Sequence, residues 1–479
     1  MKIFYLGNTF KYETEAVLKL FFPLERFEFA FDEAPLYDTD CAVIALGDEL
    51  SVEVCLNGTR VKKASPLKGG DNELELCRML FSALSGITGI VPDWGCLTGI
   101  RPVKKINALL AKGLSYEEIA GHLGEKYFLR ENKALLSYRT ALTQKNALDT
   151  LSPKSYSLYV GIPFCTTRCS YCSFVSHTIS SKGARELIPR YVEMLCREIA
   201  DTGSIMRNSG RVLDTVYIGG GTPTAISAPQ LDAVMSAIEK HFDLSSMREY
   251  SVEAGRADTI DRDKLTVIKS HGATRISINP QSLNDEVLKN IGRAHTAGEF
   301  MDAFALARSM GFDNINTDTI AGLPGDDYDS FCATIEGLIA LSSENITVHT
   351  LTVKRSASLF AGASREDFAR DGDVSRMVDG AGSRLLKAGY SPYYLYRQKN
   401  TIGNLENTGF CKPGRESLYN IYIMEECQDI IACGAGGSTK LTDPETGKIT
   451  RYFNYKYPYE YISRYDKMVE YKKLLADSE

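Results

Sequence analysis

The chain of 479 residues contains no apolar run near the roughly 18 residues of a membrane-spanning helix. Its first residues, "MKIFYLGNTF", lack the charged region and apolar core of a secretory signal peptide. Nine of its twelve cysteines are scattered singly, unlike the disulfide framework of a small secreted protein. We therefore expect a cytoplasmic protein with reduced thiols and no membrane span.

An excess of positive charge is also missing. The chain has 55 Lys and Arg against 61 Asp and Glu, a formal net charge of −6. Binding to nucleic acid depends on neutralising phosphates, so we expect no nucleic-acid partner. There is no long repeat or low-complexity tract. A hydrophobic content of 44% is typical of a globular chain, which at this length predicts roughly two to four domains.

The patterning divides the chain into three predicted domains. Residues 1–152 are expected to form an N-terminal accessory domain that opens with a short strand, "KIFYL". It contains a helix over "NELELCRMLFSALSGITG", where apolar residues recur at a helical period: Leu74, Leu76, Leu80, Phe81 and Leu84. Residues 386–479 are rich in tyrosine and are expected to form a smaller C-terminal domain that covers the substrate.

Between them, residues 153–385 alternate strand and helix patterns. Strands are predicted at 155–160, 213–219, 250–255, 274–280, 313–320 and 345–353. A helix between the second and third strands has one apolar stripe: Leu231, Val234, Met235, Ile238 and Phe242. The alternation predicts right-handed βαβ units and a parallel sheet. Six units are too few for an eight-stranded barrel. We expect an α/β fold with a partial (β/α)6 barrel that binds ligands at the carboxyl ends of its strands.

Three cysteines lie close together in "GIPFCTTRCSYCSF", directly after the first strand of this region. Cys165, Cys169 and Cys172 have the spacing C-x3-C-x2-C, and no fourth cysteine follows. Thiolates are the usual ligands of iron–sulfur clusters. Three thiolates on a four-iron cluster leave one iron open for another molecule.

Two other readings of these cysteines remain open. His177 lies five residues after Cys172 and completes a possible Cys3His zinc site. Cys169 and Cys172 alone form a C-x-x-C pair that suits redox chemistry. A glycine run, "GGGTPT" at 219–224, follows the next strand. Alone it indicates only a tight turn, but beside the cysteines it favours a polar ligand near exposed backbone N–H groups, which a structural zinc site does not require.

The cysteine motif followed by "GGGTP" resembles the radical S-adenosylmethionine (SAM) superfamily, and more narrowly the oxygen-independent coproporphyrinogen III dehydrogenase family. Further segments resemble that family in order: "VEAGR", "RISINPQS", "IGRAHT" and "NTDTIAGLPG". This resemblance covers about residues 155–360. The segments "WGCLTGIRPVKK" and "GNLENTGFCKPGRESLYNIYIMEE" resemble the HemZ branch and extend the similarity over most of the chain.

The resemblance implies a role for each motif. Cys165, Cys169 and Cys172 would hold a 4Fe–4S cluster, and SAM would bind its open iron and be cleaved to a 5′-deoxyadenosyl radical. Tyr159 joins the three cysteines as a catalytic candidate, and Tyr171 matches a contact to the adenine. The remaining matches to SAM contacts are Tyr159, Gly220, Gly221, Thr222, Glu253, Gln281, Arg293 and Asp318.

The implied activity is oxidative decarboxylation of coproporphyrinogen III to protoporphyrinogen IX, a step of haem biosynthesis. Besides this tetrapyrrole, it would need an electron donor protein and an electron acceptor. The substrate carries four carboxylates, so we expect cationic side chains around it. The candidates are Lys354, Arg355, Arg397, Lys399, Lys412 and Arg415.

Two departures from the family pattern leave the substrate open. Phe174 stands where the best-understood members have a further cysteine, and the stretch between Tyr159 and Cys165 carries Gly161 in place of a histidine. A haem-carrier branch also has the phenylalanine, but its H-N-x-x-Y-W motif is absent here. The alternatives are therefore a haem or tetrapyrrole carrier that keeps the cluster, and a radical SAM enzyme, such as a methyltransferase, for another substrate.

Overall fold

The chain folds into two compact units. A computed structural model describes residues 1–8, 10–23, 25–67, 71–174, 177–180, 182–352, 357, 359, 371–443 and 446–473. Unit 1 comprises Met1–Arg139 and Tyr396–Glu406, and unit 2 comprises Thr140–Leu395 and Asn407–Glu479. Within the described ranges, no helix has the length and apolar character needed to cross a membrane.

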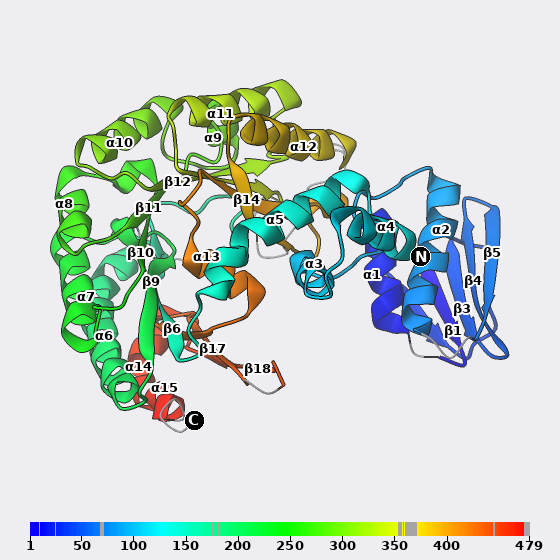
Figure 1. Ribbon diagram of the computed structural model, residues 1–479, viewed down its shortest axis with the longest axis horizontal. Coiled ribbons are helices and arrows are strands. Elements are labelled where there is room, and N and C mark those ends of the chain that lie inside the picture. The colour runs from blue at the N-terminus through cyan, green and yellow to red at the C-terminus, as the bar shows by residue number, and fades with distance from the viewer. Residues whose placement is uncertain are drawn as a thin grey trace. The chain divides into compact units, whose positions relative to one another are not determined.

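Unit 1 is built on a five-stranded sheet of order β2-β1-β3-β4-β5 (Figure 1). Strands β2, β1 and β3 are parallel, and β3, β4 and β5 form an antiparallel meander. The strands are β1 (Lys2–Leu6), β2 (Glu28–Phe31), β3 (Cys41–Leu46), β4 (Glu49–Leu56) and β5 (Thr59–Pro66). The helices are α1 (Lys11–Phe21), α2 (Asn72–Thr88), α3 (Pro102–Leu110), α4 (Tyr116–Tyr127), the amino-terminal part of α5 (Glu131–Asp149) and η5 (Ile402–Asn404).

Helix α2 shows how sequence determines this unit. The Asp71 carboxylate accepts the N–H of Leu74 and caps the first turn, and Gly89 ends the helix with φ 70°. The predicted apolar stripe faces inward, with Leu76, Leu80, Phe81 and Leu84 buried. These side chains join residues of α1 and one face of the sheet in the core of the unit.

Unit 2 contains the predicted parallel sheet. Strands β6, β9, β10, β11, β12 and β13 lie side by side in chain order, and every neighbouring pair is parallel. They span β6 (Ser155–Ile162), β9 (Val212–Gly220), β10 (Glu249–Gly255), β11 (Arg275–Ile278), β12 (Ile315–Ala321) and β13 (Asn345–Thr350). All six predicted strands are therefore present. Most of their residues are buried, as expected for a parallel sheet that is covered on both faces.

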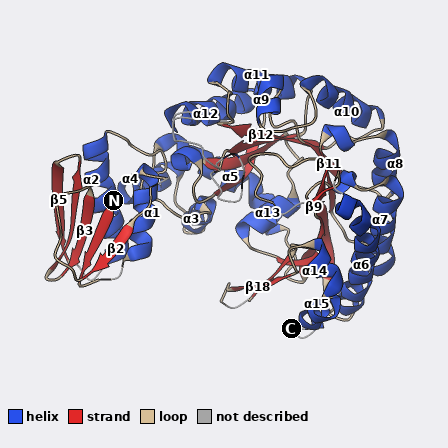
Figure 2. Ribbon diagram, turned by 180° about the vertical axis from the view of Figure 1, so that it is seen from behind, coloured by secondary structure: helices blue, strands red, loops and turns tan. Residues whose placement is uncertain are grey.

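Helices follow the strands along one side of this sheet. Figures 1 and 2 show α6, α7, α8, α10 and α11 as an outer layer, with α13 on the inner, concave side. The helices are α6 (Lys182–Arg207), α7 (Ala228–His241), α8 (Arg262–Ser270), α9 (Asp285–Asn290), α10 (Ala297–Ser309), α11 (Tyr328–Ala340), α12 (Asp371–Lys387), α13 (Leu418–Glu425), α14 (Pro458–Ser463) and α15 (Tyr465–Lys472), with short 3-10 turns η1 (Pro223–Ala225) and η2 (Ala257–Thr259).

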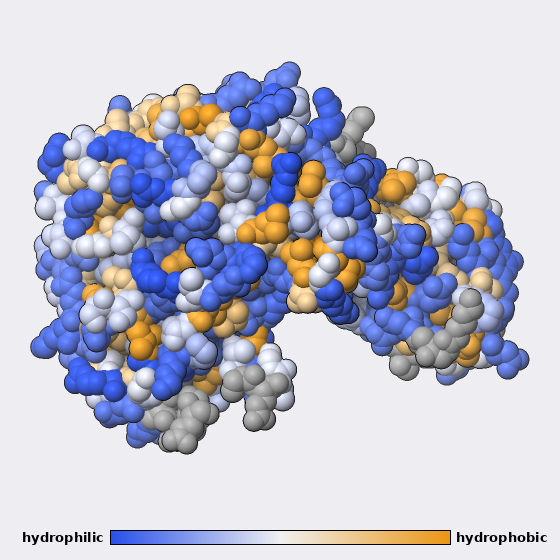
Figure 3. Space-filling view, viewed as in Figure 1, coloured by the Kyte–Doolittle hydropathy of each residue, from blue (hydrophilic) through white to orange (hydrophobic). Residues whose placement is uncertain are grey.

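The outer helices are amphipathic, as their sequences predict. In α7 the stripe of Leu231, Val234, Met235 and Ile238 is buried against the sheet, and Phe242 just beyond the helix is buried with it. Hydrophilic residues cover most of the outer helices on the face seen in Figure 3. This arrangement leaves the carboxyl ends of the strands for the loops that carry the motifs.

The C-terminal segment extends the same sheet at both edges. Strand β15 (Glu406–Cys411) pairs antiparallel with β13, and β14 (Ser391–Arg397) lies beside it. Strand β16 (Asp429–Cys433) pairs parallel with β6, and β17 (Ser438–Thr442) and β18 (Ile449–Phe453) follow antiparallel. The division into domains 1–152, 153–385 and 386–479 stays a prediction.

Candidate active site: a cysteine loop beside a polar cavity

The three cysteines lie on a loop that is fastened at both ends. The loop leaves β6 through β7 (Phe164–Cys165) and returns through β8 (His177–Thr178), which pairs with β7. The N–H of Ile179 donates to Cys165 O at 2.9 Å, and the N–H of Cys172 donates to Cys169 O at 3.1 Å. Cys169 is buried, and Cys165 and Cys172 are half-buried.

The glycine run lets β9 lie against the start of this loop. Gly220 has φ 115°, which favours glycine. A Cβ on Gly221 would lie 2.6 Å from Phe164 O and 2.9 Å from Phe164 N, so this position has no room for a side chain. The N–H of Thr222 donates to Phe164 O at 2.7 Å, and its hydroxyl lies 3.5 Å from Cys165 Sγ. The close backbone approach therefore brings the glycine run and the first cysteine together.

A cavity of about 150 Å³ lies beside the three thiols at the carboxyl ends of the strands. Nine of the predicted site residues line it: Cys165, Cys169, Cys172, Tyr171, Gly221, Thr222, Glu253, Gln281 and Arg293. Tyr159, Gly220 and Asp318 do not line it. Four further lining residues were missed from the sequence: Thr167, Gly255, Arg256 and Asn279. Arg256 and Asn279 stand within the quoted motifs "VEAGR" and "RISINPQS", so their places at strand ends were the available signal.

Glu253 is the carboxylate of this cavity. Burial raises its pKa to about 7 from the usual 4.5, although the hydroxyl of Tyr217, which donates to Glu253 Oε1, opposes the shift. Behind it the Tyr159 and Tyr217 rings are stacked with centroids 6.3 Å apart, and Tyr217 stacks on Tyr419 of α13 at 4.4 Å. Tyr159 thus lies beside Glu253 within the sheet.

Asp318 also lies behind the cavity, on β12. Its Oδ1 accepts from Asn316 Nδ2 at 2.8 Å, and its Oδ2 lies 3.8 Å from His349 Nε2. Burial would raise the pKa of Asp318, but these neighbours hold it below its usual value. The carboxylate is therefore ionised and close enough to Glu253 to oppose that group's ionisation.

Two polar atoms of the lining are buried without a hydrogen-bond partner in the described structure: Gln281 Oε1 and Arg293 Nε. Buried polar atoms are nearly always paired, so a cavity with two orphaned atoms suits a polar ligand. SAM offers an ammonium, a carboxylate and hydroxyls to such groups. Three thiols on one loop suit a 4Fe–4S cluster, which distributes its thiolates over separate irons. The residues present therefore fit both groups.

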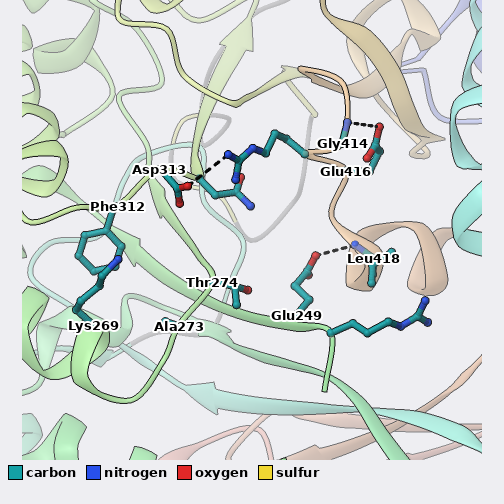
Figure 4. Close-up of a pocket in the computed structure, with 12 residues that line it drawn as sticks. Glu249, Lys269, Ala273, Thr274, Phe312, Asp313, Gly414, Glu416 and Leu418 are labelled. Atoms are coloured by element: carbon teal, nitrogen blue, oxygen red, sulfur yellow. Dashed lines mark hydrogen bonds and ion pairs between the residues drawn. The ribbon is translucent and has the colours of Figure 1, made fainter. Parts of the chain in front are cut away.

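A larger cavity of about 450 Å³ lies at the opposite, amino ends of the same strands. It is lined by residues at the starts of β10, β11 and β12, including Glu249, Thr274 and Asp313 (Figure 4). Figure 4 shows Glu249 joined to Leu418, whose N–H donates to Glu249 Oε2 at 2.7 Å.

The other charges of this larger cavity are also engaged. Arg248 pairs with Asp214 at 2.6 Å, and Arg415 pairs with Asp313 at 3.3 Å. Lys269 Nζ donates to Gly311 O at 2.7 Å. Because its charges are satisfied within the protein, we do not place the functional site there, despite its size.

The cations suggested for the substrate carboxylates are divided between the two units and the residues that the structure does not describe. Lys354 and Arg355 lie outside the described residues. Lys412 Nζ donates to Ser342 O at 2.8 Å. Both Lys412 and Arg415 lie at the amino ends of the strands, opposite the cysteine loop.

The remaining two candidates belong to unit 1. Arg397 donates to Leu97 O and, at 3.1 Å, to Asn404 O. Lys399 Nζ lies 4.8 Å from the centroid of the Tyr12 ring.

Comparison with known proteins identifies the family of the chain. The model of the radical SAM superfamily matches residues 159–338. The oxygen-independent coproporphyrinogen-III oxidase-like protein HemZ of Bacillus subtilis is 40% identical over 392 residues, which cover 81% of this chain and 78% of HemZ. The chain belongs to the radical SAM family of HemZ.

Other members of this family carry a different description. The heme chaperone HemW of Haemophilus influenzae is 31% identical, covering 64% of this chain and 75% of HemW. The structure of the coproporphyrinogen III oxidase HemN of Escherichia coli has a TM-score of 0.53 at 20% identity, covering 69% of this chain and 73% of HemN. The predicted superfamily and the predicted α/β radical SAM fold are confirmed. A 4Fe–4S cluster and SAM are the cofactors of this family.

Proposed function

We propose that this protein is a radical SAM oxidoreductase that converts coproporphyrinogen III to protoporphyrinogen IX without oxygen, in haem biosynthesis. The observation that carries the proposal is one cavity lined by three cysteine thiols and by the orphaned polar atoms of Gln281 and Arg293. The relationship to HemZ, described as oxidase-like, supports the substrate class.

In this proposal the loop thiols of Cys165, Cys169 and Cys172 hold the cluster. The cluster and SAM together supply a 5′-deoxyadenosyl radical. Arg293 pairs with the carboxylate of SAM through its guanidinium, and the Glu253 carboxyl group accepts from the ammonium or from the hydroxyls. The backbone of Gly221 and Thr222, together with Gln281, completes the SAM site, and Tyr171 packs against the adenine.

The substrate step requires partners besides the tetrapyrrole. Each propionate that becomes a vinyl group loses one hydrogen atom, one CO2 and one electron. An electron donor protein must reduce the cluster, and an acceptor must take the electron from the substrate. The chain's own contribution is to orient the reactants at the strand ends and to exclude water.

A second candidate is a haem or tetrapyrrole carrier that keeps the cluster. The relatives described as heme chaperones favour it, as does Phe174, which is 39% exposed beside the last cysteine of the loop. A third candidate is a radical SAM enzyme, such as a methyltransferase, for another substrate.

One anoxic experiment separates the three candidates. The purified protein is incubated with reductant, SAM and coproporphyrinogen III, after its iron, sulfide and zinc are measured. Protoporphyrinogen with 5′-deoxyadenosine supports the decarboxylase, and tight haem binding without turnover supports the carrier. Deoxyadenosine without porphyrin conversion supports another substrate, and zinc as the sole metal would contradict all three.

A cysteine substitution tests the cluster ligands. We expect Cys169→Ala to abolish deoxyadenosine formation and the SAM-dependent change of the electron paramagnetic resonance spectrum, because one iron loses its thiolate. Cys196→Ala is the matched control, since this half-buried cysteine lies on α6 and its thiol donates to Ala233 O of α7 at 3.5 Å. Wild-type rates of SAM cleavage in Cys169→Ala would refute the assignment.

A further inference from the structure

One buried cation touches a cysteine of the loop. Arg256 directly follows β10, at its carboxyl end, and is only 4% exposed. Its Nη1 lies 3.6 Å from Cys169 Sγ and donates to Thr167 O at 3.2 Å. The guanidinium therefore joins the end of β10 to the middle of the cysteine loop.

A carboxylate fixes the direction of this side chain. Arg256 Nε donates to Asp258 Oδ1 at 2.9 Å, and Thr166 Oγ1 donates to Asp258 Oδ2 at 2.6 Å. Burial would raise the pKa of Asp258, but this effect is outweighed by hydrogen bonds from His295, Arg256 and Thr166. The net pKa lies below the usual value, so the carboxylate is ionised. With Nε held by Asp258, Nη1 is directed at the thiol.

We propose that Arg256 sets the reduction potential of the cluster held by Cys169. Hydrogen bonds to cluster sulfurs and nearby charge determine such potentials. A guanidinium stays protonated at all working pH values and places a full positive charge next to the sulfur. One-electron reduction of the cluster adds negative charge, which this cation stabilises, so the potential rises. The inference rests on the proposed ligand role of Cys169, but not on the identity of the organic substrate.

The alternative is that Arg256 only holds the loop in place through Thr167 and Asp258. The two roles make different predictions. A purely structural arginine would change how much cluster is bound and leave the midpoint potential of the bound cluster unaltered. An electrostatic arginine changes the midpoint itself.

The test is an anoxic redox titration of the reconstituted full chain, followed by electron paramagnetic resonance, with dithionite as electron source and no tetrapyrrole. We expect Arg256→Gln to move the midpoint to a more negative potential. Arg256→Lys keeps the positive charge but loses the planar guanidinium group. Its midpoint potential should lie between those of Arg256→Gln and wild type. Arg262→Gln removes an exposed arginine at the start of α8 and should leave the midpoint unchanged.

The midpoint does not depend on the fraction of chains that carry a cluster, so partial loading does not disturb the readout. A wild-type midpoint in Arg256→Gln would overturn the proposal. Complete loss of iron from both Arg256 variants would also overturn it, in favour of the structural role. A shifted midpoint in a protein that fails to convert coproporphyrinogen would refute the proposed substrate and leave the role of Arg256 intact.

Discussion

At the scale of single residues, the cavity owes its character to a few buried charges that face each other. Glu253 on β10 and Asp318 on β12 are carboxyl groups of parallel strands that have β11 between them, yet their pKa values move in opposite directions. Burial dominates at Glu253, whereas His349 and Asn316 outweigh burial at Asp318. One site thus holds a protonatable and an ionised carboxyl group at neutral pH.

The raised pKa of Glu253 predicts a pH-dependent stability. The folded protein binds this proton more tightly than the unfolded chain, so its contribution to stability is full below about pH 4.5 and falls as the pH rises to about 7. We expect wild type to lose about 2 kcal/mol relative to Glu253→Gln across this interval, allowing for partial exposure. The measurement is urea unfolding of the anoxic protein at several pH values.

Tyr217→Phe provides the second arm of this test. It removes the hydroxyl that stabilises the ionised carboxylate, so the interval of falling stability should extend to higher pH than in wild type. Parallel pH profiles for wild type and Glu253→Gln would show that this carboxyl group titrates normally.

At the scale of the elements, the positions of the strands in the sequence were easier to predict than the pairing of one strand with another. The six central strands were predictable because they are buried on both faces and are separated by amphipathic helices. Strand β16 was not predicted to pair with β6, because nothing local in "DIIAC" specifies a partner more than 270 residues away. The motif residues could be predicted to lie close together, because the carboxyl ends of neighbouring parallel strands meet at one edge of the sheet.

The contact between Arg256 and Cys169 could not be predicted from the sequence. Spacing places a residue at a strand end, but the direction of a long side chain depends on partners such as Asp258, which only the folded chain supplies. The same holds for Tyr419, which reaches the stack beside Glu253 from a helix late in the chain.

The fit between β9 and the cysteine loop predicts a severe effect for Gly221→Ala. The new methyl group would overlap the backbone of Phe164, which directly precedes Cys165, so the loop must shift. We expect a stability loss of about 1–3 kcal/mol and several-fold less iron per chain. Unfolding curves and iron analysis give the two readouts.

Gly298→Ala is the matched control within the same unit. A Cβ at Gly298 on α10 would make only an ordinary contact, 3.8 Å from Thr296 Oγ1. This variant should retain wild-type iron and equal or higher stability. If Gly221→Ala also retained full iron, the glycine run would not be needed to position the loop.

At the scale of the whole unit, a buried ion pair joins helix α15 near the end of the chain to helix α6, which follows the cysteine loop. Lys472 of α15 and Glu198 of α6 are both fully buried and form an ion pair at 2.6 Å. Glu198 also accepts the N–H of Gly434 at 2.6 Å, next to β16. Tyr191 of α6 donates to Gly161 O at 2.7 Å, at the end of β6. Through α6, helix α15 therefore supports the strand that leads into the cysteine loop.

A double-mutant cycle on this pair tests that support. Lys472→Met leaves the Glu198 carboxylate buried without its cation and should cost about 3–5 kcal/mol of unfolding free energy. Lys472→Met combined with Glu198→Gln should cost less than the sum of the two single changes, because no unpaired charge remains.

The neighbouring pair Arg197–Asp466 joins the same two helices at 3.9 Å but is exposed, so Arg197→Ala should cost below about 1 kcal/mol. Equal costs for Lys472→Met and Arg197→Ala would mean that burial of the pair does not hold the C-terminal helix to the barrel.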